Sequence, residues 1–345
     1  MLPQKILLVR PDRAGDALKT LPALRALLRQ MPQTEVRLLT TSFNDSIFSF
    51  EPNVKTCPLP LHWEKLNDLD LGKVVADLLG GVFDVAIGLP ADAVPELKKI
   101  MPAIPALKKY SRLPESHEHH HLAFPTGTPA LQDERKNIAF LIGSALGIPL
   151  DIDGISNIPV LSTLDRQEAL EHLGKKTGKW YALSPFAGEA HRHLTPKMVL
   201  ACLDALGGVP QVEKIFISGG PTNYEALQTF RRNSRDPKKI QIVLPSSFRA
   251  LAAYLERADG VIGAQSGPLH LSIAMGLPTL GFLGGCDLER WYPDRSGRFT
   301  LLQRGIFDRF RTRWGVQRHL KKWLRATSGS TPAPIAWQAP IPVLF

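Results

Sequence analysis

Two strand-to-helix turns carry the residues of this chain that are best suited to chemistry. Asp16 stands near the start of a predicted helix, just past an apolar run at 6–9, and Ser266 and Gly267 open a second short helix after another apolar run. A carboxylate beyond the end of a parallel strand can act as a general base on a substrate hydroxyl. A helix N-terminus presents unpaired N–H groups to an anion. The two turns therefore predict a base and a phosphate or diphosphate site.

Each of these residues also has a structural explanation. Asp is a preferred helix N-cap, so Asp16 is equally consistent with capping. His270 stands on the first turn of the second helix, where it could touch a ligand. A single histidine in an apolar stretch is also consistent with packing alone. The residue types by themselves leave both alternatives open.

Two further loops follow predicted strands in the same half of the chain. One contains Arg192 between two histidines, and a cation there can neutralise a diphosphate; a solvated basic loop explains it equally well. The other contains Gly219 and Gly220, which permit close approach of the backbone to a ligand or make a plain tight turn.

Metal and disulfide chemistry are not favoured. Four histidines lie within residues 117–121, and clustered histidines can bind zinc or copper. No matching cluster of cysteines or carboxylates accompanies them, so we interpret this segment as a basic loop. The cysteines Cys57, Cys202 and Cys286 are widely spaced, which argues against a disulfide scaffold and indicates a reducing compartment.

The charge balance favours anionic partners. The 345 residues include 42 Lys and Arg against 32 Asp and Glu, a net charge of +10. Nucleic acid, a lipid surface and phosphorylated substrates all fit such a charge, although no nucleic-acid-binding module is recognised. The first residues lack the regions of a signal peptide. The glycines and prolines of residues 261–286 favour a buried α/β segment over a membrane span, and we expect a soluble protein.

The elements that would position these residues alternate between strands and helices. Strands are predicted at 6–9, 36–39, 85–89, 180–183, 214–217, 240–244, 261–263 and 279–282, and helices after the first strand and at 131–146, 163–173, 195–206, 222–232 and 247–257. Residues 149–159, rich in proline and aspartate, read as a linker. Two such arrays predict two Rossmann-like domains with parallel sheets.

The C-terminal section is basic. Residues 304–325 carry eight Lys and Arg and one acid, Asp308, with interleaved aromatic residues. Such a segment could rest on an acidic membrane face. Alternatively, it forms a C-terminal helix that crosses back onto the first domain.

Taken together and in this order, the motifs resemble glycosyltransferase family 9, the lipopolysaccharide heptosyltransferase family. The resemblance rests on residues 6–25 with the Gly15-Asp16 turn, on 133–137 with 146–149, on the Ser-Gly-Pro-Leu-His sequence at 266–270, and on 286–293. It covers most of residues 4–325.

The resemblance implies a GT-B architecture, in which two Rossmann-like domains face a central cleft. Residues 1–155 would bind the acceptor and 156–310 the nucleotide sugar, while 311–345 would form a basic helix packed back on the N-terminal domain and a Pro-rich tail. It further implies inverting, metal-independent transfer from a nucleotide sugar, typically ADP-heptose, without a cofactor. The acceptor would be an anionic lipopolysaccharide-core or related glycan. The enzyme would be cytoplasmic, with peripheral contact at the inner membrane surface.

The resemblance also assigns roles to individual residues. Asp16 would be the catalytic base, and Arg192 with the helix start would stabilise the departing diphosphate. The residues that would bind the donor are Arg192, Ser184, Gly220, Asn223, Gln265, Ser266, Gly267 and His270. The residues that would bind the acceptor are Arg13, Lys98, Lys99, Arg112 and His120.

Two positions depart from the family pattern. Gln265 stands where the family usually has Asp, and Asn223 where it often has an acid. The change at Gln265 is compatible with a donor sugar other than heptose or with weaker donor binding, and the change at Asn223 leaves the identity of the nucleotide open. Two other functions stay open: a degenerate member that binds a nucleotide sugar or partner without transfer, and another GT-B enzyme such as a sugar-nucleotide epimerase.

Overall fold

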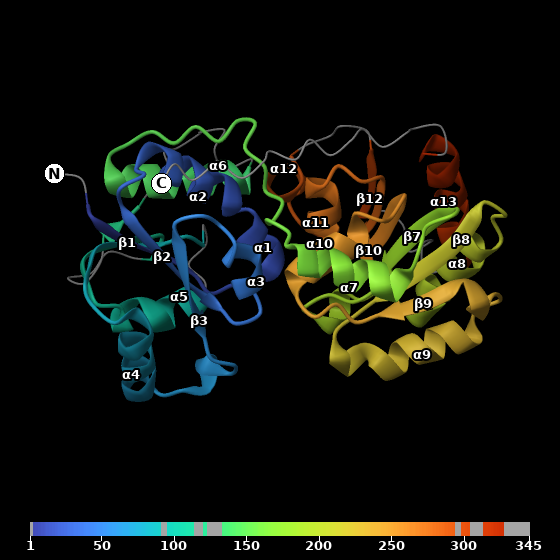
Figure 1. Ribbon diagram of the computed structural model, residues 1–345, viewed down its shortest axis with the longest axis horizontal. Coiled ribbons are helices and arrows are strands. Elements are labelled where there is room, and N and C mark those ends of the chain that lie inside the picture. The colour runs from blue at the N-terminus through green and yellow to red at the C-terminus, as the bar shows by residue number, and fades with distance from the viewer. Residues whose placement is uncertain are drawn as a thin grey trace. The chain divides into compact units, whose positions relative to one another are not determined.

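The computed structural model describes residues 3–90, 95–113, 120–122, 133–293, 298–303 and 313–327. The chain divides into two compact units (Figure 1): Met1–Val160 with Asp287–Pro293, and Leu161–Cys286 with Asp294–Phe345. Each unit contains one sheet of six described strands, all of them paired in parallel. The predicted α/β class with two parallel-sheet domains is confirmed.

The N-terminal unit has the strand order β3-β2-β1-β4-β5-β6. Its strands are β1 (Lys5–Arg10), β2 (Glu35–Thr41), β3 (Val54–Leu59), β4 (Phe83–Gly88), β5 (Ala106–Ser111) and β6 (His120–His121). Its helices are α1 (Ala14–Leu18), α2 (Leu21–Gln30), α3 (Asp45–Phe48), α4 (Asp68–Leu79), α5 (Pro95–Ile100), α6 (Glu134–Leu146) and α12 (Leu288–Trp291), with short 3-10 turns η1 (Trp63–Lys65) and η2 (Met101–Ala103).

Local sequence explains the strongest elements of this unit. β1 is buried at every position from Ile6 onward, as expected for a parallel strand covered on both faces. α6 begins after Asp133, whose carboxylate accepts the N–H of Arg135 at 2.9 Å. It ends at Gly147, which adopts the left-handed conformation with φ of 69°.

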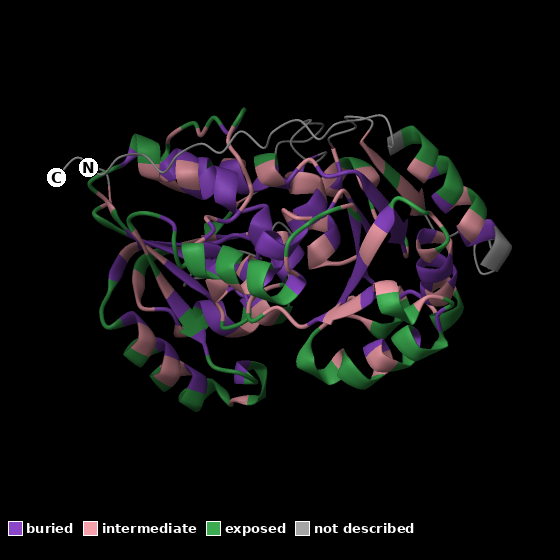
Figure 2. Cartoon of the chain, turned by 45° about the vertical axis from the view of Figure 1, so that its right-hand side comes forward, coloured by how far each residue is buried: buried purple, intermediate pink, exposed green. Residues whose placement is uncertain are grey.

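The C-terminal unit has the strand order β12-β11-β10-β7-β8-β9. Its strands are β7 (Lys179–Ser184), β8 (Val212–Ser218), β9 (Ile240–Val243), β10 (Gly260–Ala264), β11 (Thr279–Leu283) and β12 (Phe299–Gln303). Its helices are α7 (Thr163–Leu173), α8 (Pro196–Gly207), α9 (Tyr224–Asn233), α10 (Phe248–Leu255), α11 (Gly267–Ala274) and α13 (Arg313–Thr327), with 3-10 turns η4 (Ala190–Arg192), η5 (Pro221–Asn223) and η6 (Pro237–Lys239). Figure 2 shows that the strands are largely buried while the helices expose their outer faces.

The expectation that the C-terminal basic helix packs back on the N-terminal domain is wrong. α13 packs against α8, and its residues Val316, Leu320 and Trp323 lie in the core of the C-terminal unit. Burial of these three apolar side chains anchors the helix there. The segment that returns to the N-terminal unit is instead Asp287–Pro293, and the first unit extends to Val160 rather than to residue 155.

Each sheet changes its winding direction at one point. In the N-terminal sheet this switch point lies between β1 and β4, and in the C-terminal sheet between β7 and β10. Open α/β sheets bind ligands beyond the carboxyl ends of the strands at such points. The turns after β1, β7 and β10 are therefore the places to look for a site. Among the residues that the structure describes, no helix is both long and apolar enough to span a bilayer.

Candidate functional site

The turn after β1 contains a buried arginine. Arg10, the last residue of β1, is fully buried, and its Nε lies 2.9 Å from Oδ1 of Asp12. Its Nη2 donates to the main-chain oxygen of Asp16 at 2.9 Å. A buried cation requires a nearby opposite charge, and Asp12 supplies it. Arg10 therefore links the beginning of the turn to the first residues of α1.

Two polar side chains from β2 and the loop after it hold the same turn. Thr40 Oγ1 donates to the main-chain oxygen of Arg10 at 2.9 Å, and Asn44 Nδ2 donates to that of Asp12 at 2.6 Å. Both side chains are fully buried. They satisfy main-chain oxygens at the end of the strand and restrict the turn to one conformation.

Asp16 lies in the first turn of α1 and is not its N-cap residue. Arg13 occupies the N-cap position of α1, and Asp16 is the third helical residue. Its side chain is half-buried, and its carboxylate accepts a hydrogen bond from the main-chain N–H of Arg13. Burial raises its pKa, although the charges of Arg10 and Arg13 act in the opposite direction. A carboxylate with a raised pKa is a stronger base than an exposed one.

A second carboxylate, which the sequence analysis did not single out, lies in the same turn. Burial raises the pKa of Asp12 to about 7; Arg10 lowers it and the charge of Asp16 raises it further. The two carboxyl groups therefore influence each other's titration. The available signal was position: Asp12 follows the same strand end and precedes the same helix as Asp16.

Buried charges attach α12 to the N-terminal unit. Lys19 Nζ donates to the main-chain oxygen of Trp291 at 2.9 Å, and Arg290 Nε lies 2.8 Å from Oε2 of the buried Glu134. Burial lowers the pKa of Lys19 to about 8. Lys19 is also one of the cations that act on Asp16, so this attachment belongs to the electrostatic surroundings of the candidate base.

The residues expected to bind the acceptor are spread over several elements. Arg13 is exposed beside Asp16, and Lys98 is exposed on α5. Lys99 donates its ammonium to the main-chain oxygen of Glu64. Arg112 follows β5 and donates to the main-chain oxygen of Leu122 at 2.6 Å, while the exposed His120 in β6 lies beside Tyr110, with ring centroids 5.1 Å apart. Their role as one acceptor surface stays a prediction.

The strand-turn-helix-strand arrangement predicted around residue 267 is confirmed by β10, α11 and β11. Ser266 takes the N-cap position in extended conformation, but its hydroxyl donates back to the main-chain oxygen of Ala264 at 3.0 Å. No side chain caps the first turn of α11. Gly267 opens the helix, and His270 follows, half-buried, on that turn. The start of α11 is therefore open to an anionic ligand.

Gln265 and Arg192 meet at the glycine that follows β11. Oε1 of Gln265 accepts the N–H of Gly284 at 3.0 Å. A Cβ at Gly284 would lie 3.6 Å from both this oxygen and Cγ of Arg192. The Arg192 guanidinium pairs with Glu189, with Nε 3.1 Å from Oε2. The structure thus brings together, beside the switch point, residues separated by more than 70 positions in the sequence.

Ser184 and the turn after β8 also lie at the carboxyl ends of strands in the C-terminal sheet. Ser184 ends β7 beside Gly263 of β10 and shares a buried hydrogen bond of 2.7 Å with the hydroxyl of Ser218. Oδ1 of Asn223 accepts the N–H of Gly220 at 3.0 Å. That bond gives Asn223 a structural role in the tight turn, whatever it does for a nucleotide.

Metal ligation finds no support in the part of the chain that the structure describes, where no group of three or more His, Cys, Asp or Glu could hold an ion. His117 and His119 of the histidine-rich segment lie outside the described residues. This finding therefore does not test whether that segment binds a metal.

Solved structures share this fold. The glycosyl transferase family 9 protein from Veillonella parvula DSM 2008 matches with a TM-score of 0.72 at 16% identity, over 95% of this chain and 98% of that one. The E. coli heptosyltransferase WaaC with ADP matches with a TM-score of 0.65 at 15% identity, over 94% and 99%. E. coli ADP-heptose lps heptosyltransferase II gives the same values. No curated protein matches at the level of sequence.

The family model of glycosyltransferase family 9 (heptosyltransferase) matches residues 211–299, which run from β8 to the start of β12. The match lies mostly within the C-terminal unit. The matched region includes Gln265, Ser266, Gly267 and His270, so the candidate anion site lies within the part of the chain that the family model matches.

Proposed function

We propose that this chain is an inverting, metal-independent transferase that moves a sugar from a nucleotide-sugar donor to a hydroxyl of a lipopolysaccharide-core or related glycan. The observation that carries the proposal is the C-terminal switch point, where Arg192, Gln265 and the uncapped start of α11 converge. Such a set suits a diphosphate, because main-chain N–H groups and a guanidinium both bind phosphate oxygens well.

The chemistry we propose divides between the two turns. Asp16 accepts the proton of an acceptor hydroxyl as that oxygen attacks the anomeric carbon of the donor sugar. The new bond forms on the face opposite the nucleoside diphosphate, and the bond from the anomeric carbon to the diphosphate oxygen breaks. The charge that develops on the leaving diphosphate is stabilised by the start of α11 and by Arg192. Inversion follows from this single displacement.

An ADP-linked donor is the first choice. The structurally similar E. coli WaaC has been solved with ADP and with ADP-2-deoxy-2-fluoro heptose. Gln265 favours a donor sugar other than heptose. Its Oε1 is occupied by Gly284, so its amide nitrogen is the part that would face a ligand, and this nitrogen can only donate. We infer that the donor sugar presents an acceptor oxygen at this position.

The acceptor is proposed to be anionic and membrane-associated, with the enzyme at the cytoplasmic face of the inner membrane. The net charge of +10 supports this choice, because a basic surface concentrates acidic ligands. The sequence-level candidates Arg13, Lys98, Lys99, Arg112 and His120 remain the residues to test for acceptor binding.

A donor screen tests the proposal. ADP-heptose, other ADP-sugars, and GDP-, UDP- and dTDP-sugars are added to the protein, and the unfolding midpoint is measured with each. A true donor raises the midpoint because it binds only the folded state; 100-fold excess over Kd adds about 2.7 kcal/mol. The best donor is then incubated with lipopolysaccharide-core acceptors, and products are identified by mass spectrometry. A protein that no nucleotide sugar stabilises would contradict the proposal.

One alternative has a specific observation behind it. The neutral Gln265 and the structural use of Asn223 favour a member that binds a nucleotide sugar without transferring the sugar. Stabilisation by a donor with no product from any acceptor would support this alternative. Donor isomerised in the absence of an acceptor would instead indicate an epimerase.

A further inference from the structure

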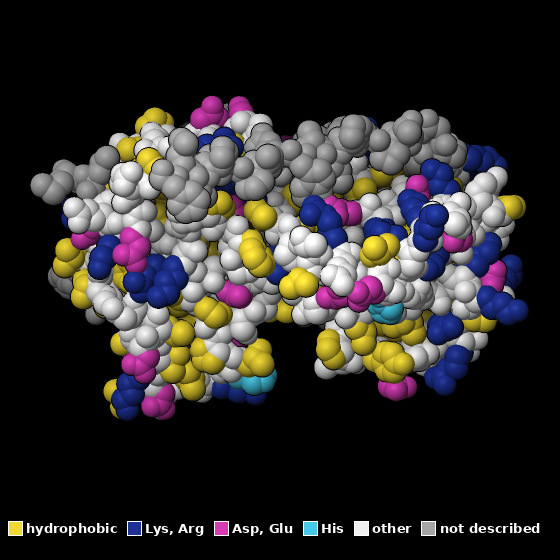
Figure 3. All heavy atoms as spheres, in the orientation of Figure 1, with side chains coloured by type: hydrophobic (Ala, Val, Ile, Leu, Met, Phe, Trp, Pro, Cys, Tyr) yellow, Lys and Arg dark blue, Asp and Glu magenta, His cyan; other side chains and the backbone are white. Residues whose placement is uncertain are grey.

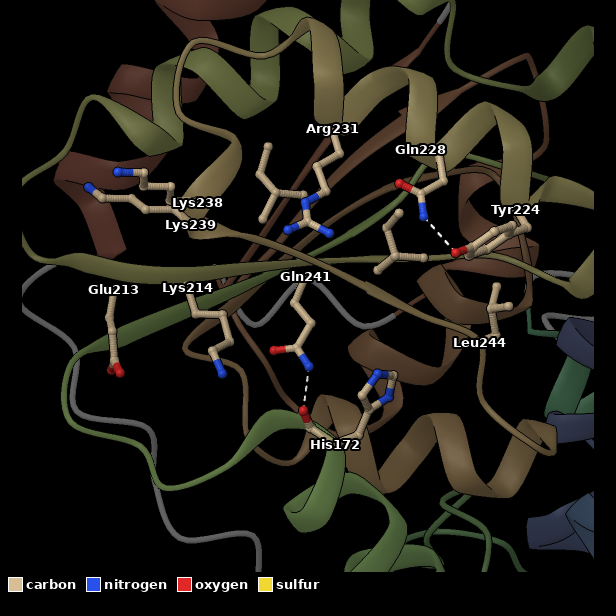
Figure 4. Close-up of a pocket in the computed structure, with 12 residues that line it drawn as sticks. His172, Glu213, Lys214, Tyr224, Gln228, Arg231, Lys238, Lys239, Gln241 and Leu244 are labelled. Atoms are coloured by element: carbon tan, nitrogen blue, oxygen red, sulfur yellow. Dashed lines mark hydrogen bonds between the residues drawn. The ribbon is translucent and has the colours of Figure 1, made fainter.

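A cavity of about 640 Å³ lies along the outer strand of the C-terminal sheet, away from the switch point. Figure 4 shows β9 crossing this cavity, with Arg231, Gln228 and Tyr224 extending from α9 on one side and His172 and Gln241 on the other. β9 is the last strand of the sheet as described. The cavity is therefore a groove around the open edge of a strand.

The main chain of β9 directs hydrogen-bonding groups into this groove. β9 pairs with β8 in parallel, and Val243 accepts the N–H of Gly219, which follows β8, at 3.4 Å. In a strand, the N–H and C=O of one residue point to the same side, and those of the next residue point to the other. Gln241 and Val243 therefore face β8, whereas the N–H and C=O of Ile242 face the open edge. An open edge of this kind can pair with another strand.

The groove has an excess of positive charge. Its cations are Lys214, Arg231, Lys238 and Lys239, and its one carboxylate is Glu213. Figure 3 shows Lys and Arg side chains (dark blue) gathered over this end of the C-terminal unit.

The carboxylate offsets one of the four positive charges: burial lowers the pKa of Lys214, and the charge of Glu213 raises it. Glu213 accepts hydrogen bonds from the N–H groups of Thr177 and Gly178 and from Nε1 of Trp180. These bonds hold its pKa down, at about 2, despite partial burial.

Three of the four cations donate to main-chain oxygens. Lys214 donates to Leu173, and its Nζ lies 4.6 Å from the centroid of the Trp180 ring. Arg231 donates to Pro237 at 3.3 Å, and Lys239 donates to Gly207 at 2.9 Å. None of the four cations forms an ion pair with a carboxylate of the described residues.

We propose that this groove binds an extended, acidic segment of a partner protein, which adds to β9 as a further strand. The outward N–H and C=O of Ile242 would pair with the main chain of the segment. Acidic side chains on one face of the added strand would meet Arg231, and those on the other face Lys214. The four cations, which otherwise discourage strand pairing at an edge, would thus select an acidic strand.

Two other occupants fit the charges less well. A second copy of this chain would bring the same four cations to the edge, and like charges facing each other oppose pairing. The chain's own residues 328–345 contain no Asp or Glu, so they do not offer the complementary charge. An acidic segment of a different protein is the occupant that the charges favour.

The test uses a fluorescent, end-capped octapeptide of repeating Glu-Glu-Val-Val, which places Glu on both faces of an extended strand, with binding to the full chain followed by anisotropy. We expect saturable binding that weakens with added salt. Arg231→Glu should weaken binding at least tenfold. The matched control is Lys73→Glu, a charge reversal at an exposed lysine of α4 in the other unit, and it should leave binding within about twofold.

Two further changes test strand pairing itself. Ile242→Pro removes an outward N–H but no bond to β8, so it should weaken binding at least tenfold, while Ile242→Val should not; unfolding midpoints show whether each variant is folded. A peptide N-methylated at alternate residues keeps its charge but cannot pair along one edge, and it should bind at least tenfold more weakly.

Other outcomes would overturn the proposal. Equal binding of the N-methylated peptide, or complete competition by inorganic tripolyphosphate at equal charge concentration, would indicate a site for small anions. A dimer in sedimentation that Ile242→Pro dissociates would identify a second copy as the occupant. If the peptide does not bind at low salt, the proposal is wrong, and the four cations serve only to protect the edge of β9 from pairing with another strand.

Discussion

The turn after β1 and the turn after β10 each lie beside the switch point of their sheet, and each leads into a helix. They use different chemistry. The first contains two ionisable carboxylates, Asp12 and Asp16, whose pKa values are raised by burial beside Arg10. The second contains an amide, a hydroxyl, a glycine and an uncapped helix start, with Arg192 as the nearby cation.

This difference matches two distinct tasks. A proton acceptor must change its charge during a reaction, so its environment has to adjust its pKa. A diphosphate keeps its charge throughout, and fixed main-chain dipoles with one permanent cation serve it without titrating near neutral pH. Both kinds of site can therefore begin from the same strand-turn-helix unit, and the side chains decide which kind results.

The largest effect is expected from Asp16→Asn. The amide cannot accept the proton of the acceptor hydroxyl, so turnover should fall about a thousandfold, while donor binding changes little. Initial rates by mass spectrometry and the donor-induced shift of the unfolding midpoint measure the two properties separately. Asp77→Asn, at an exposed carboxylate of α4, is the matched control. Full turnover of the Asp16 variant would show that Asp16 is not the base, and the proposed difference in task between the two turns would be wrong.

Arg192→Ala should weaken donor binding at the C-terminal switch point. Loss of the guanidinium removes a charge-assisted contact to the donor diphosphate, an effect of about 2 kcal/mol or roughly thirtyfold in donor affinity. Titration calorimetry with the best donor measures this affinity. Arg192→Lys should retain part of it, because the charge remains but the paired donor geometry is lost. A variant with unchanged donor affinity would place the diphosphate elsewhere.

Asp12→Asn tests whether the first turn is tuned by its second carboxylate. Burial raises the pKa of Asp12 from 3.8 to about 7, so the folded protein holds this proton more tightly than the unfolded chain. Its contribution to stability is therefore full below pH 3.8 and is lost as the pH rises through about 7. The amide of the variant does not titrate, so its contribution to stability does not change with pH. The unfolding midpoint of the variant minus that of the wild type should rise between pH 4 and 8.

The same variant makes a kinetic prediction. Removing the charge of Asp12 should lower the pKa of Asp16, because the two carboxylates repel each other. The acid limb of the kcat/KM profile should therefore move to lower pH. A profile that stays in place would show that Asp12 serves only the structure of the turn.

The smallest effect is expected from Gln265→Glu. This change keeps an oxygen to accept the N–H of Gly284 and replaces the amide nitrogen with a carboxylate oxygen. If the donor sugar presents an acceptor oxygen here, its affinity should fall about tenfold, or about 1.4 kcal/mol. An increase in affinity would show instead that the sugar donates a hydroxyl hydrogen to this position. Calorimetry on the same donor distinguishes the two results.

The strongly apolar elements could be predicted from the sequence, and the strands interrupted by charged residues or proline could not. The predicted helix 163–173 coincides with α7, and all the predicted strands are present. The predictions missed β3, β5, β6 and β12. β3 includes Lys55 and Pro58, and β5 includes the adjacent Lys108 and Lys109, so neither shows the continuous apolar run of a central parallel strand.

The site was predictable only where one residue type implied one chemistry. The glycine and serine at the start of α11 point to an anion from local geometry alone. The meeting of Gln265, Gly284 and Arg192 depends on the order of the strands, which no local pattern encodes. The raised pKa of Asp12 depends in the same way on the burial of Arg10, a residue whose type normally indicates an exposed position.

The attachment of α12 has a consequence for the synthesis of this protein. The buried Lys19 and Glu134 find partners in Trp291 and Arg290, which leave the ribosome long after Val160, the last residue of the first stretch of that unit. At about 5–20 residues per second, the intervening chain takes roughly 6–25 s to emerge. During that interval the nascent N-terminal unit carries a buried ammonium and a buried carboxylate without their final partners. Its completion therefore has to wait until the strands from β7 to β11 have been translated.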